Sequence, residues 1–81
     1  MTDSAIAARM INALEAAANR EAAAKTALVS INIEMLTPAD AGAVDVSTER
    51  KTRTLVFLRA DFRTDAGALV ASASSVHKIL G

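Results

Sequence analysis

The alternation of apolar and polar residues divides the chain into a helical segment and a longer segment of strands. Within an alanine-rich stretch, Ile6, Met10, Leu14 and Ala17 recur at helical spacing. This pattern predicts one helix over about residues 4–25, with the apolar stripe against a core. From Leu28 onward the period falls to two, which is typical of half-buried strands.

Four strands are predicted after the helix, at about residues 28–36, 44–50, 54–64 and 69–79. In the first strand the apolar side is expected to consist of Val29, Ile31, Ile33 and Met35. Residues Thr37–Ala43 form a corner with a proline and a glycine, whereas Asp65–Gly67 has the composition of a tight turn. We expect Gly42 and Gly67 to supply left-handed backbone positions.

The two connections predict the order of the strands. The corner at Thr37–Ala43 is too long and too restricted by Pro38 for a tight hairpin, so the first strand is expected to pair with the last. The sheet would then run second, third, fourth and first strand. Since one helix covers only one face of such a sheet, we predict an α+β domain with the sheet curled around the helix. At the start of the helix, Asp3 or Ser4 is expected to be the N-terminal cap, because its side-chain oxygen can accept a hydrogen bond from a free amide of the first turn.

Length and composition predict a small domain that self-associates. The chain has 81 residues, 52% of them hydrophobic, and no cysteine to form disulfides or thiolate metal sites. Small cores are often supplemented by oligomerisation, and the edge strand at Leu28–Leu36 invites pairing with a copy of itself. We therefore expect a homodimer or a dimer of dimers joined through this strand.

Charge and targeting signals exclude several classes of partner. Nine basic and nine acidic side chains cancel, and the only aromatic residues are Phe57 and Phe62. No overall field or stacking platform is therefore expected to attract nucleic acid. The start Met1–Ser4 lacks a basic region followed by an apolar run, and charged residues interrupt the helix, so a cytoplasmic location without membrane contact is predicted.

Three segments resemble the hotdog-fold acyl-CoA thioesterases of the phenylacetate type. Ser30–Pro38 resembles that family's strand ending in leucine, a polar residue and proline, Arg50–Phe57 its basic hairpin, and Arg63–Ala71 its acidic-glycine turn. The resemblance implies a single hotdog-like domain over residues 1–81, with one long N-terminal helix wrapped by a four-stranded antiparallel sheet. The implied ligand is an acyl-CoA, with coenzyme A as part of the substrate and no separate cofactor.

The resemblance also implies where catalytic residues would lie. In such enzymes a glycine-containing segment opens the central helix and polarises the thioester carbonyl, and an Asp or Glu about one helix length later activates water or attacks directly. The glycine segment is expected before Met1. Counting back from Pro38 places the acidic position near Asn12, and Glu15 is the only carboxylate in the middle of the helix. Both are catalytic candidates, and a solvated or interface-facing role is the alternative for each.

The remaining candidates concern ligand binding. Lys51 and Arg53, with Arg50, would hold coenzyme A phosphates if the resemblance extends to function, and a solvated turn is the alternative. His77 is the only histidine and is expected to be a structural or surface residue, because no serine lies in a nucleophile-elbow pattern and one imidazole does not make a zinc site.

Two functions from different classes remain open. The first is a protein that binds or hydrolyses acyl-CoA thioesters at a subunit interface. The second is a non-catalytic hotdog module for assembly or for binding an apolar ligand. A further alternative is that a partner chain supplies the N-terminal elements that the resemblance implies.

Overall fold

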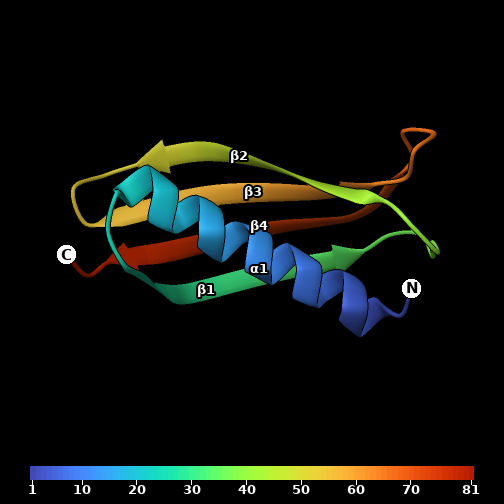
Figure 1. Cartoon of the computed structure of the whole chain (residues 1–81), viewed down its shortest axis with the longest axis horizontal. Coiled ribbons are helices and arrows are strands. Elements are labelled where there is room, and N and C mark those ends of the chain that lie inside the picture. The colour runs from blue at the N-terminus through green and yellow to red at the C-terminus, as the bar shows by residue number, and fades with distance from the viewer.

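One helix lies across one face of a four-stranded antiparallel sheet (Figure 1). The computed structural model describes all residues from Met1 to Gly81. Its elements are α1 (Asp3–Ala22), β1 (Thr26–Met35), β2 (Ala43–Lys51), β3 (Leu55–Arg63) and β4 (Leu69–Ile79). The strand order is β1-β4-β3-β2, which confirms the predicted order and the predicted α+β architecture.

The helix α1 starts and ends earlier than its sequence predicted. Its cap is Thr2, whose Oγ1 accepts a hydrogen bond from the Ala5 amide at 3.1 Å, so the prediction of Asp3 or Ser4 was wrong. Thr2 has extended dihedral angles, which orient its hydroxyl toward the free amides of the first turn. At the other end Ala23 adopts a left-handed conformation with φ of 50°, and this stops the helix before Lys25.

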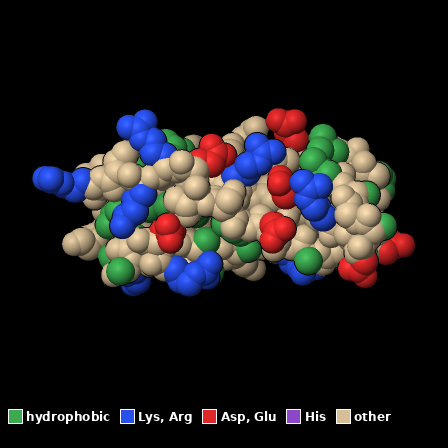
Figure 2. All heavy atoms as spheres, turned by 90° about the horizontal axis from the view of Figure 1, so that it is seen from above, with side chains coloured by type: hydrophobic (Ala, Val, Ile, Leu, Met, Phe, Trp, Pro, Cys, Tyr) green, Lys and Arg blue, Asp and Glu red, His purple; other side chains and the backbone are tan.

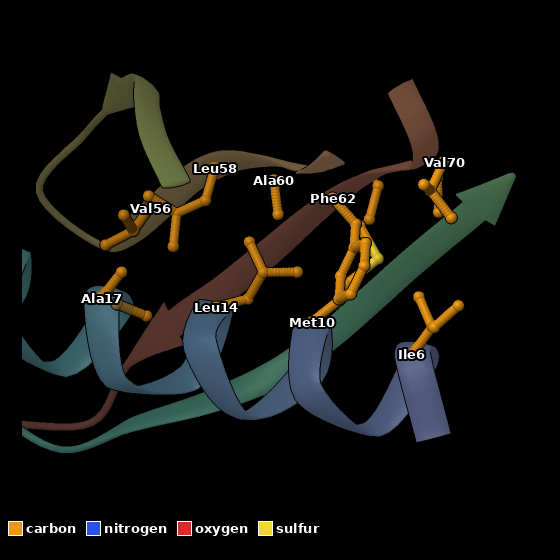
Figure 3. Close-up of a cluster of buried hydrophobic side chains, with 12 residues drawn as sticks. Ile6, Met10, Leu14, Ala17, Val56, Leu58, Ala60, Phe62 and Val70 are labelled. Carbon is orange, nitrogen blue, oxygen red and sulfur yellow. The ribbon is translucent and has the colours of Figure 1, made fainter. Parts of the chain in front are cut away.

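The core lies between α1 and the two central strands (Figure 3). The predicted stripe of α1 is buried against alternate residues of β3, which are Val56, Leu58, Ala60 and Phe62. Small residues complete this interface: Ala17 and Ala18 on α1 face the sheet, and Ala71 and Ala73 lie on β4. Ile31 and Ile33 of β1 pack against the core from the side.

A bulge in β1 changes which residues share a face. The pairing with β4 shifts between Leu28 and Ser30, which lie opposite His77 and Val76. Val29 is the extra residue and is 59% exposed, so Leu28 takes its expected place on the side of Ile31 and Ile33. The predicted apolar face with Val29 in it was therefore wrong at that position.

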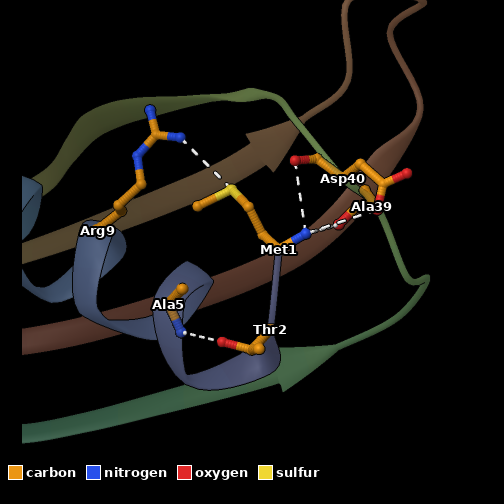
Figure 4. A network of polar contacts seen from close by, with 6 residues as sticks. All are labelled: Met1, Thr2, Ala5, Arg9, Ala39 and Asp40. Atoms are coloured by element: carbon orange, nitrogen blue, oxygen red, sulfur yellow. Dashed lines mark hydrogen bonds and ion pairs between the residues drawn. The ribbon is translucent and has the colours of Figure 1, made fainter.

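The corner between β1 and β2 contacts the start of α1 (Figure 4). The Met1 ammonium group donates to the carbonyl of Ala39 at 3.0 Å and lies 3.7 Å from the Asp40 carboxylate. Arg9 donates to the carbonyl of Gly42 at 3.2 Å. A Cβ atom on Gly42 would lie 2.5 Å from the carbonyl oxygen of Arg63, so this glycine permits a close approach of two backbones.

The two glycines expected at left-handed positions differ in role. Gly67 has a φ of 89° in the turn between β3 and β4, which confirms the prediction for that residue. Gly42 has no positive φ, so the prediction for it was wrong. Its lack of a side chain is needed because Arg63 and Phe62 are so near.

Candidate functional site

Asn12 and Glu15 are both exposed and, three residues apart on α1, lie beside each other on its solvent side. Arg9 contacts Gly42 just before β2, so its side of the helix faces β2. Glu15 follows six residues later, about 240° around the helix axis at 3.6 residues per turn. That rotation places Glu15 on the side of the helix nearer β1, with Asn12 about 60° further round on the same solvent-facing side.

The basic residues lie around the turn between β2 and β3. Lys51 pairs with Val56 and therefore lies on the helix side of the sheet, while Arg53 is in the turn itself. Arg50 pairs with Phe57 on the outer face, where its guanidinium carbon is 6.0 Å from the centre of the Phe57 ring. The fold brings Lys51 and Arg53 to one hairpin but does not join them with Glu15, which faces the opposite edge of the sheet.

Charged side chains are distributed unevenly along the length of the molecule, with more basic ones toward one end, although the net charge is zero (Figure 2). The end formed by the β2–β3 turn, the end of α1 and the end of β4 has six basic and two acidic side chains, a formal charge of +4. They are Arg20, Lys25, Arg50, Lys51, Arg53 and Lys78 with Glu21 and Glu49. We call this the basic end.

The opposite end has the reverse composition. Six acidic and two basic side chains give it a formal charge of −4 in a molecule 38 Å long. They are Asp3, Glu34, Asp40, Asp45, Asp61 and Asp65 with Arg9 and Arg63. We call this the acidic end. The net charge remains zero, so no overall field is expected, but the topology gives the molecule one end with more basic side chains and one with more acidic side chains.

Ser75 and His77 form a buried polar pair beneath α1. Their relative exposures are 3% and 1%, and Ser75 Oγ lies 2.8 Å from His77 Nε2. His77 Nδ1 is also buried and has no hydrogen-bond partner. No substrate can reach a serine buried in this way, so the pair is a structural feature of the core. Their i, i+2 spacing on a strand was the signal in the sequence that could have revealed the contact.

The pKa of His77 makes the fold sensitive to mild acid. Burial lowers this pKa below the ordinary value of 6.5, and the negative charge of Glu15 partly opposes the shift. The unfolded chain therefore binds a proton more readily than the folded one as the pH falls below about 6.5. We expect the free energy of unfolding to be fully retained above that pH and to decrease below it.

Urea unfolding at pH 7.5 and pH 5.5 measures this loss. His77→Gln removes the titration, and because His77 is the only histidine, the decrease over this interval should become much smaller in that variant. An identical decrease in the wild type and in His77→Gln would show that other groups cause it.

The outer face of the sheet has a polar network that the sequence did not reveal. Ser72 accepts a hydrogen bond from Arg59 at 3.0 Å and donates one to Asp61 at 3.1 Å, and Arg63 lies 3.6 Å from the same carboxylate. A shallow groove of about 250 Å³ beside it is lined mainly by polar side chains, including Asn32 and Glu34. This face is better suited to water and polar contacts than to an apolar ligand.

Two further features bear on the class of protein. The structure contains no group of three or more His, Asp or Glu side chains placed to hold a metal ion. The helix α1 does not combine the length and apolarity required of a membrane-spanning helix.

Solved structures with the same arrangement of helix and sheet decide the fold. A Bacillus halodurans protein determined with CoA superposes on 99% of the chain with a TM-score of 0.89 and 17% identity. A candidate thioesterase from Ralstonia eutropha, related to phenylacetic acid degradation, covers 69% of the chain with a TM-score of 0.62 and 28% identity. A thioesterase from Haemophilus influenzae covers 70% with a TM-score of 0.64 and 19% identity. The chain has the hotdog fold of the thioesterases.

The chain is shorter than each of these three proteins. The chain spans 56%, 43% and 41% of the lengths of the three proteins. No protein-family model and no curated protein matches the sequence. The fold expected from the resemblance is confirmed.

Proposed function

We propose that this hotdog protein binds acyl-CoA-type thioesters, with the phosphates of the coenzyme A moiety held at the basic end. The observation that carries the proposal is the concentration of positive charge around the β2–β3 turn, where Lys51 and Arg53 are exposed. A cluster of exposed cations raises the local concentration of phosphate-bearing ligands. The presence of CoA with the Bacillus halodurans protein supports this choice of ligand.

Hydrolysis of the bound thioester would depend on Glu15. It is the only carboxylate in the middle of α1, and its exposure leaves it free to act as a base. Asn12 cannot accept a proton from water at neutral pH, so its role in this proposal is to contact ligand or a second subunit.

A non-catalytic binding and assembly role is the second candidate, and the start of α1 favours it. Asp3 lies in the first turn, where a thioesterase of this fold would stabilise negative charge on the carbonyl oxygen with helix amides. The Asp3 carboxylate opposes such charge. We further propose that the protein works as a homodimer or a dimer of dimers, as the apolar edge strand β1 suggests.

Calorimetric titration with CoA and with dephospho-CoA tests the proposed ligand. The double variant Lys51→Ala/Arg53→Ala is expected to bind CoA at least tenfold more weakly, equivalent to about 1.4 kcal/mol. It should also discriminate less between the two ligands, because fewer cations remain to bind the additional phosphate.

Arg63→Ala is the matched control, since it removes a cation of the acidic end and should leave CoA affinity nearly unchanged. Equal losses in Arg63→Ala and in the double variant would mean that the basic end is not the binding site. No binding of CoA at millimolar concentration would reject the proposed ligand and leave the assembly role.

A further inference from the structure

We propose that a hollow on the outer face of the sheet, beside Phe57, binds an adenine base. The inference rests on the proposed function, because adenine is the purine of coenzyme A, and it adds a subsite for that base. The hollow has a volume of about 240 Å³, which suits one base better than a whole coenzyme, since sites for drug-sized ligands measure roughly 300–1,000 Å³. We call it the outer hollow, and the side chains around it are those of Ser30, Asn32, Glu49, Phe57, Ser74 and Val76.

Phe57 and Val76 give the outer hollow an apolar floor. The two residues are partners in the pairing of β3 with β4, so their side chains lie side by side on the face away from α1, and both are half-buried. An aromatic ring in such a place can stack against a base, because every base has a π face. One ring is enough for one base, and the other phenylalanine, Phe62, is buried in the core.

Arg50 adds a cation to this floor. Its guanidinium carbon lies 6.0 Å from the centre of the Phe57 ring, and Arg50 forms no ion pair. The ion pairs of the outer face instead join Arg59 and Arg63 to Asp61. A planar guanidinium group stacks on aromatic rings and on bases, so Arg50 is free to contact a purine that lies against Phe57.

The polar side chains of the outer hollow match the edge of adenine. Asn32 can donate to N7 and accept from the N6 amino group, which is the bidentate contact by which asparagine recognises adenine. The Glu49 carboxylate only accepts hydrogen bonds, so it also favours a base with an exocyclic amino group at this position. Guanine has an oxygen acceptor there instead of an amino group, and the outer hollow therefore favours adenine over guanine.

The basic end lies next to the outer hollow. Lys78 follows Val76 by two residues on β4, about 7 Å further along the same face. Arg53 lies in the β2–β3 turn, beyond the start of β3. A nucleotide whose base lies against Phe57 can therefore extend its phosphates toward these cations.

Titration calorimetry with coenzyme A and with 4′-phosphopantetheine, which lacks the nucleotide, tests the subsite. Phe57→Leu keeps an apolar side chain and removes the ring, so it should weaken coenzyme A binding by at least about fivefold, equivalent to about 1 kcal/mol. The same variant should bind 4′-phosphopantetheine as the wild type does. Phe57→Tyr keeps the ring and is the matched control, with wild-type affinity expected for both ligands.

Proton NMR of the wild type with adenosine 3′,5′-bisphosphate locates the base directly. The chain has two phenylalanines, one histidine and no tyrosine or tryptophan, so its aromatic signals are few. Stacking should shift the ring protons of Phe57 and give cross-relaxation between them and adenine H2 or H8. The signals of the buried Phe62 should stay unchanged.

Three results would overturn the adenine subsite. They are wild-type coenzyme A affinity in Phe57→Leu, an equal loss of affinity for both ligands in that variant, and no change in the Phe57 signals at millimolar adenosine 3′,5′-bisphosphate. Circular dichroism spectra matching the wild type would verify that both variants are folded. A wild type that binds no coenzyme A would reject the proposed function, and the NMR titration would still decide whether the outer hollow binds adenine.

Discussion

Replacing Phe62 with alanine is expected to lower the free energy of unfolding by about 4 kcal/mol, the usual cost of removing a buried aromatic side chain. Phe62 is fully buried near the end of β3 and is the largest side chain of the core. The surrounding alanines cannot extend to fill the space it leaves. A domain of this size has about 5–15 kcal/mol of stability at most, so much of the variant should be unfolded at 37 °C.

Phe57→Ala is the matched control, because Phe57 is the other phenylalanine and lies half-buried on the outer face of the same strand. It should cost about 1 kcal/mol, the lost area being smaller and the site open to solvent. The chain has no tryptophan or tyrosine, so urea unfolding is followed by circular dichroism. Equal decreases in the free energy of unfolding of Phe62→Ala and Phe57→Ala would mean that Phe62 contributes no more to the core than the half-buried Phe57.

If the protein hydrolyses the proposed thioester, replacing Glu15 with glutamine is expected to reduce that hydrolysis by about a hundredfold or more, the usual scale for losing a general base. The change keeps the size of the side chain and removes its charge. We expect wild-type turnover to be slow as well. In the proposed reaction the oxyanion would form at the first turn of α1, where the carboxylate of Asp3 opposes its negative charge.

Single-turnover hydrolysis of short, medium and aromatic acyl-CoAs measures this effect. Asn12→Ala alters the other candidate position of the same helix without removing a base, and it should leave the chemical step nearly unchanged. Turnover that persists in Glu15→Gln would remove Glu15 from the mechanism. Fast turnover by the wild type would contradict the non-catalytic alternative and show that Asp3 does not hinder the reaction.

Local sequence patterns were sufficient to predict the architecture, because each helix or strand is specified by residues that are close together in the sequence. The stripe from Ile6 to Ala17 and the alternation along β3 each specify an element, and Pro38 and Gly67 specify how elements connect. The bulge at Val29 could not be predicted in this way. Its position depends on the fit of β1 against β4, which is a contact between distant segments.

The candidate site was less predictable than the fold for the same physical reason. The sequence identified Lys51 and Arg53 as neighbours, but their separation from Glu15 follows from the order of the strands. The net charge of zero concealed the basic and acidic ends, because a sum over residues contains no positions. Ser75 and His77 were recognisable only once β4 was known to be central and covered by α1.

The alanines between α1 and the sheet have a consequence for any fatty ligand. Ala17, Ala18, Ala60, Ala71 and Ala73 let the helix backbone lie close to the strands, and all five are buried. A hydrocarbon tail could enter that layer only by lifting the helix from the sheet. The acyl chain of the proposed ligand would therefore lie on the exterior of the protein. Replacing the interior alanines with larger or smaller residues should change the melting temperature of the protein without changing its preference for acyl-chain length.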